Sequence, residues 1–116
     1  MLLSLNTAVW FYPSPIDFRK QLDGLILLIV DCMELNPTSG HVFVFRNRGA
    51  SKIKIVWWDK NGFWLLYKRL EKGKFKFPAV SDKTLELTTE QMSWLLTGLD
   101  FTKHTPLPSV TATHFY

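Results

Sequence analysis

The chain has 116 residues, with 14 Lys and Arg against 10 Asp and Glu, and 47% of its residues are hydrophobic. This length suits one compact domain, and the apolar content is too high for a disordered chain. The longest apolar run, Leu25 to Val30, is far shorter than the roughly 20 residues that a membrane span requires. Cys32 is the single cysteine and no secretory leader pattern is recognised, so we expect a cytoplasmic protein without disulfides or membrane contact.

The first part of the chain predicts a strand followed by a long helix. Residues 7–12 are apolar and aromatic enough for a strand, and Ser14, Pro15 and Asp17 form a helix start signal in which Ser14 caps the helix and Asp17 completes a capping box. The helix is expected to run to about Leu35, where Asn36-Pro37 ends it. Its apolar face recurs at helical spacing and consists of Phe18, Leu22, Leu25, Ile26, Ile29 and Met33.

The middle of the chain predicts four consecutive strands joined by short turns. Asn61-Gly62 is typical of a tight hairpin turn, because both residues tolerate positive φ angles. Consecutive hairpins make an antiparallel sheet. The expected strands are residues 41–45, 52–58, 63–70 and 74–77.

The last part of the chain predicts a short strand and a short helix. Leu85 to Leu87 form the strand, and Thr88 with Gln91 makes a second capping box before a helix from Thr89 to about Thr97, ended by Gly98. The fold class is therefore α+β: an antiparallel β-meander sheet with one long helix packed on it and a short C-terminal helix. Residues 1–102 are expected to form a single domain and residues 103–116 a mobile C-terminal tail.

Charge is distributed unevenly along the chain. Between Arg46 and Lys76 there are ten basic residues against two acidic ones, whereas the rest of the chain has four basic and eight acidic residues. Such asymmetry is typical of a protein that binds a polyanion on one side. The alternative is a solvated sheet whose lysines protect its edges.

The expected strands place pairs of these basic residues on one face of the sheet. Lys52 and Lys54, and likewise Lys74 and Lys76, recur with the two-residue period of a strand, so each pair projects from one face. Same-face lysines are then about 6.6 to 6.8 Å apart, close to the phosphate repeat of a nucleic-acid strand. Trp58 or Trp64 would add base stacking, although core packing is the commoner role of tryptophan. The candidate DNA-binding residues are Arg46, Arg48, Lys52, Lys54, Lys68, Arg69, Lys72, Lys74 and Lys76.

A second hypothesis uses the long helix. Its second half is apolar over a wide arc that includes Leu27, Leu28 and Val30, which indicates burial between layers or against another chain. In this alternative the protein is an interaction adaptor, or self-associates as a homo-oligomer, and the lysines only keep the sheet soluble.

The sequence contains no pattern that supports an enzyme. His41, His104 and His114 are scattered, no spacing fits a metal site, and no glycine-rich loop precedes a helix to hold a phosphate or a cofactor. Cys32 lies among Leu, Ile and Val, and we interpret it as a small packing residue. We therefore predict no catalytic residues, no metal and no cofactor.

Four segments in order resemble one family. They are residues 17–25 (DFRKQLDGL), 40–48 (GHVFVFRNR), 53–59 (IKIVWWD) and 62–73 (GFWLLYKRLEKG). Together they are similar to the TnpB accessory proteins of the insertion-sequence sixty-six group, which are unrelated to the RNA-guided nuclease of the same name. The resemblance implies a nonenzymatic role in DNA transposition beside a separate transposase, with element DNA and that transposase as partners.

Overall fold

The structure is a computed structural model that describes residues 7–77 and 84–97. Within these ranges the chain forms one sheet of five strands with the spatial order β4-β3-β2-β1-β5. The strands are β1 (Val9–Phe11), β2 (Val42–Arg46), β3 (Lys52–Asp59), β4 (Gly62–Arg69) and β5 (Leu85–Leu87). The predicted hairpins from β2 to β3 and from β3 to β4 are confirmed by antiparallel pairing.

The sheet is mixed rather than antiparallel throughout, which corrects the meander prediction. β1 runs parallel to β2, with Val9 opposite Val42, and antiparallel to β5, with Val9 also opposite Leu87. Parallel neighbours need a long crossover connection instead of a hairpin, and residues 12–41 supply one that contains a helix. β1 therefore lies inside the sheet, between the hairpins and the short strand β5.

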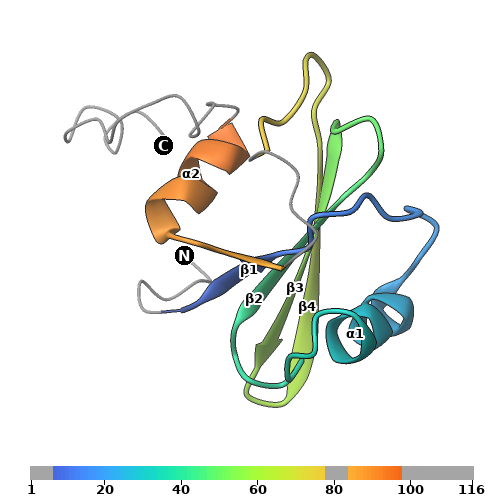
Figure 1. Ribbon diagram of the computed structural model, residues 1–116, viewed down its shortest axis with the longest axis vertical. Helices are drawn as coiled ribbons and strands as arrows, with labels where there is room; N and C mark the ends of the chain where they lie inside the picture. Colours follow the sequence, from blue (N-terminus) through green and yellow to red (C-terminus); the bar gives the residue numbers. More distant parts are fainter. Residues whose placement is uncertain (1–6, 78–83, 98–116) are drawn as a thin grey trace.

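Two short helices cover opposite faces of the sheet, α1 (Leu22–Asp31) and α2 (Thr89–Thr97) (Figure 1). Each sheet face therefore carries a separate core, and the two helices form two layers with the sheet between them. On the α2 face, Val9, Phe11, Val44, Ile53 and Ile55 pack with Met92 and Leu95. On the α1 face, Phe43, Phe45 and Val56 pack with Leu25, Ile29 and Met33.

The first helix is ten residues long, so the prediction of one long helix is wrong at both ends. Residues 15–21 form a loop because their backbone groups have other partners: the Ile16 N–H donates to Arg46 O at 2.9 Å, and the Lys20 N–H to Asp17 O at 3.0 Å. The Asp17 carboxylate does not close a capping box but accepts hydrogen bonds from Arg19. At the other end Glu34 has a φ of 57°, a left-handed conformation that interrupts a helix.

Residues 74–77, predicted as the fourth strand of the meander, do not join the sheet. The Phe75 N–H donates to Ala50 O at 2.7 Å, which holds this segment against the loop between β2 and β3. The predicted alternation is nevertheless present, since Phe75 is buried, Phe77 stacks on Phe11 at 5.1 Å, and Lys74 and Lys76 are exposed.

The capping box of α2 is confirmed. The Thr88 N–H donates to Gln91 Oε1 at 2.9 Å and the Gln91 N–H to Thr88 Oγ1 at 3.0 Å. The turn between β3 and β4 takes its positive φ at Lys60 rather than at the predicted Asn61-Gly62. The expected helix end at Gly98 and the tail 103–116 lie outside the described residues. Neither helix of the described ranges is long and apolar enough to cross a membrane.

Candidate nucleic-acid interface

Three segments of the basic region meet at one end of the sheet. Lys52 at the start of β3 is opposite Arg69 at the end of β4, and the Leu70 N–H donates to Ser51 O at 2.8 Å. The hydrogen bond from the Phe75 N–H to Ala50 O brings the residues after β4 to the same end of the sheet. Figure 1 shows the two loops, residues 47–51 and 70–77, side by side at the top of the sheet. We call this surface the basic end; its cations are Arg48, Lys52, Arg69, Lys72, Lys74 and Lys76.

Asn47 organises the loop that carries Arg48. Its side-chain Oδ1 accepts hydrogen bonds from the N–H groups of Ser51 at 2.9 Å and Lys52 at 3.0 Å, and its Nδ2 donates to Ser51 Oγ at 3.2 Å. Ala50 completes the turn with a φ of 58°. This role of Asn47 was not predicted, although asparagine at the start of a turn is a known signal because its side chain accepts hydrogen bonds from the backbone ahead of it. Arg48 consequently projects from an ordered loop.

The cations of the basic end are exposed, apart from Lys52, which is half-buried. Glu71 is the one acidic residue between Gly62 and Lys76, and its carboxylate lies 2.8 Å from the Arg69 guanidinium. The hydrogen bonds of this ion pair raise the pKa of Arg69 and lower the pKa of Glu71. An exposed pair of this kind contributes little to stability. The basic end therefore keeps a strong excess of positive charge.

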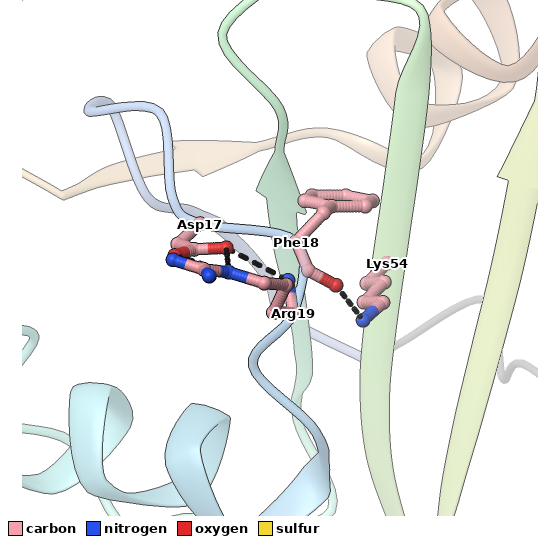
Figure 2. A network of polar contacts seen from close by, with 4 residues as sticks. All are labelled: Asp17, Phe18, Arg19 and Lys54. Atoms are coloured by element: carbon pink, nitrogen blue, oxygen red, sulfur yellow. Dashed lines mark hydrogen bonds and ion pairs between the residues drawn. The ribbon is translucent and has the colours of Figure 1, made fainter.

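Lys54 does not belong to this surface, contrary to the expectation of an open charged face. Only 5% of the residue is exposed, because the loop before α1 covers that side of β3. Its Nζ donates to Phe18 O at 2.8 Å and to Lys20 O at 2.7 Å, and it lies 4.9 Å from the centre of the Phe18 ring. Figure 2 shows Lys54 reaching the Phe18 carbonyl next to the Asp17–Arg19 pair. Burial lowers the pKa of Lys54. Its ammonium thus holds the loop and is not free to contact phosphate.

Two more predicted cations also have partners within the fold. Arg46 donates from Nη2 to Pro13 O at 2.9 Å and lies over the Phe77 ring, while its Nε is buried without a partner. Burial, with a smaller contribution from Arg48, lowers the pKa of Arg46. Lys68 donates from Nζ to Leu96 O at 2.6 Å, in the last turn of α2. Six of the nine candidates therefore form the basic end. The other three, Arg46, Lys54 and Lys68, donate hydrogen bonds to carbonyl oxygens of other segments.

Some of the aromatic and apolar candidates are packed within the fold, and others are exposed. Trp58 packs edge-on against Phe63 at 4.9 Å, whereas Trp64 is 45% exposed. On α1, Leu27 is 61% and Val30 46% exposed, but Leu28 packs into the core of the α1 face. Cys32 is exposed, which corrects its interpretation as a packing residue. Within the described residues, no three His, Cys, Asp or Glu side chains are grouped as a metal site.

The fold and this surface define a small α+β protein with a cationic sheet end. Residues 7–106 match the family described as "IS66 Orf2 like protein", TnpB_IS66, so the chain belongs to that family. Two proteins of Sinorhizobium fredii strain NGR234 are similar to it: uncharacterized protein y4jC, 39% identical over 78% of this chain and 77% of its own length, and uncharacterized protein y4hO, 35% identical over 83% and 84%. No solved structure matches the chain.

Membership of this family confirms the resemblance that the four sequence segments indicated. It makes the chain an accessory protein associated with transposition, in a family that is not known for enzymatic activity.

Proposed function

We propose that this accessory protein is not an enzyme and binds DNA through the basic end. The observation that carries the proposal is the convergence of six cations from three segments onto one end of the sheet, with Glu71 as the neighbouring acid. Each segment is fixed by backbone hydrogen bonds, so little order has to be gained when the loops meet a phosphate backbone. In this proposal the protein acts in the cytoplasm, with the DNA of the element and the transposase as its partners.

The number of cations sets the expected salt dependence. The logarithm of the binding constant falls with the logarithm of salt concentration with a slope of about −0.9 for each phosphate contacted on duplex DNA. If all six cations contact phosphates, the slope is about −5. Phosphate contacts carry no sequence information, so this surface provides affinity and orientation rather than recognition of a particular sequence.

Two charge-matched double variants test the proposal. Lys72→Gln with Lys74→Gln removes two cations from the basic end, and Lys20→Gln with Lys60→Gln removes two exposed cations from the loop before α1 and from the far turn of the β3–β4 hairpin. Net charge changes equally in both proteins. Fluorescence anisotropy of a labelled duplex, at several salt concentrations, measures the binding constant and its slope.

We expect the Lys72/Lys74 variant to bind more weakly on all sequences, with a slope shallower by about 1.8, since two phosphate contacts are lost. The Lys20/Lys60 variant should keep the slope of the unchanged protein. Equal effects of the two variants would show that only net charge matters and would reject the basic end as the contact surface.

An interaction adaptor is the second candidate, and the exposure of Leu27 and Val30 on α1 favours it. These residues lie among Asp23 and Asp31 on the outer side of the helix. Apolar side chains surrounded by carboxylates suit a partner surface that is apolar with a basic rim, and the transposase of the same element is the partner to test.

A further inference from the structure

The outer edge of β4 is long and unpaired within the described part of the chain. β4 is the terminal strand of the sheet, bonded to β3 on one side, and it is eight residues long. An edge strand offers a row of free N–H and C=O groups to any other strand. Two of the exposed large apolar side chains, Trp64 and Tyr67, also lie on β4.

The pairing with β3 shows which backbone groups of β4 face outward. The Leu70 N–H donates to Ser51 O across the hairpin, so residues 70 and 51 form a hydrogen-bonded pair. In an antiparallel ladder such pairs recur at every second residue, so Lys68, Leu66 and Trp64 also bond inward to β3. The N–H and C=O groups of the alternate residues therefore point away from the sheet. These are Phe63, Leu65, Tyr67 and Arg69.

The side chains of β4 are arranged in two unlike halves. Phe63 and Trp64 make the first half aromatic, and Lys68 and Arg69 make the second half cationic, with Leu66 between them. An antiparallel copy of the same strand reverses this order, so aromatic residues come opposite cations. Contacts between a cation and an aromatic face are favourable, whereas like charges placed directly opposite each other are unfavourable.

We propose that β4 pairs antiparallel with β4 of a second copy of this chain, with the two-fold axis passing beside Leu66. In this register Trp64 lies opposite the second copy's Lys68, and Phe63 opposite its Arg69. Leu65 and Tyr67 also face each other, so every outward-facing residue from 63 to 69 enters a hydrogen-bonded pair. Lys68 donates one hydrogen bond to Leu96 O, which leaves two donors on its ammonium.

Other registers give β4 fewer backbone hydrogen bonds or less favourable side-chain pairs. A shift by one residue places outward-facing groups opposite inward-facing ones and breaks the ladder. A shift by two residues in one direction sets Lys68 and Arg69 opposite leucines. A shift by two in the other direction leaves Arg69 beyond the paired segment. A second copy of this chain supplies the cations that lie opposite Trp64 and Phe63. The aromatic half of one β4 strand therefore faces the cationic half of the other.

The first test compares two substitutions at Tyr67 by sedimentation velocity over a range of concentrations. Tyr67→Pro removes an outward N–H, and Tyr67→Val keeps it; both lose the edge-on contact of Tyr67 with Phe18. We expect the unchanged protein and the Tyr67→Val variant to dimerise and the Tyr67→Pro variant to raise the dimer dissociation constant at least tenfold. Circular dichroism checks that both variants are folded.

The second test fixes the register by disulfide formation in a Cys32→Ser background, which removes the exposed native thiol. Leu66→Cys places two thiols opposite each other at the two-fold axis, in a pair whose Cα atoms are about 4.5 Å apart, a spacing that allows a disulfide. The matched control is Trp64→Cys. Its two thiols are separated by four residues along the strands, about 13 Å.

We expect mild oxidation to give a covalent dimer with Leu66→Cys and none with Trp64→Cys. A monomer at all concentrations overturns the proposal, and so does a dimer that Tyr67→Pro leaves intact. A covalent dimer formed by Trp64→Cys in preference to Leu66→Cys overturns the register. Because the cross-linking does not involve Tyr67, it also decides the question if the proline variant fails to fold.

Discussion

The substitution Lys54→Met tests whether Lys54 stabilises the fold or contacts DNA. Lys54 is buried, and its ammonium donates two hydrogen bonds of 2.7 and 2.8 Å to carbonyl oxygens of the loop before α1. Methionine keeps much of the apolar stem and removes the donors. Hydrogen bonds from a charged group contribute about 1.5–3 kcal/mol each, but the lowered pKa of Lys54 indicates that desolvation offsets part of this gain.

We therefore expect Lys54→Met to reduce the free energy of unfolding by about 2 kcal/mol, which lowers the Tm of a domain of this size by roughly 10 °C. Lys52→Met is the matched control on the same strand, because Lys52 belongs to the basic end. It should change the Tm little and weaken DNA binding. Urea denaturation and anisotropy measure the two quantities. If Lys54→Met leaves stability unchanged and weakens DNA binding, Lys54 contacts DNA and does not hold the loop.

Three further predictions concern single side chains. Hydrogen bonds from Arg19 lower the pKa of Asp17 to about 2, so its stabilisation is present above about pH 4 and is lost as the pH falls through about 2; Asp17→Asn should lower the Tm at pH 7 and have a much smaller effect in a melt near pH 2, where about half of the carboxyl groups are protonated. Thr88→Ala removes the cap of α2 and should cost about 1 kcal/mol in urea denaturation, with an unchanged value counting against the cap. Leu27→Glu should leave the Tm unchanged because Leu27 is exposed, and should abolish capture by the transposase; retained capture rejects the adaptor hypothesis.

Local signals in the sequence predicted local structure well. The α2 capping box depends on two side chains three residues apart, and its hydrogen bonds form as expected. The similar signal at Ser14 and Asp17 failed because distant residues compete for the same segment. Arg46 binds Pro13 O and Lys54 binds Phe18 O, so the loop is fixed by strands that come more than 30 residues later.

The same limit applies to the candidate site. The alternation of Lys52 and Lys54 correctly placed both side chains on one face of β3, but alternation does not show what covers that face. The loop before α1 covers Lys54 and leaves Lys52 at the sheet end. Clustering of Arg48 with Lys74 depends on the hydrogen bond from Phe75 to Ala50, a contact between segments that no periodicity encodes.

The basic end and the β4 dimer together determine how many DNA molecules are held. A two-fold axis perpendicular to β4 reverses the strand direction, so the two basic ends lie at opposite ends of the joined sheet and face away from each other. One straight duplex that contacts one basic end therefore cannot also contact the other, and we expect a dimer to hold two duplexes. Energy transfer between a donor-labelled and an acceptor-labelled duplex measures this bridging. Tyr67→Pro should abolish the transfer while each duplex still binds by anisotropy, and transfer that persists in this variant would contradict bridging through β4.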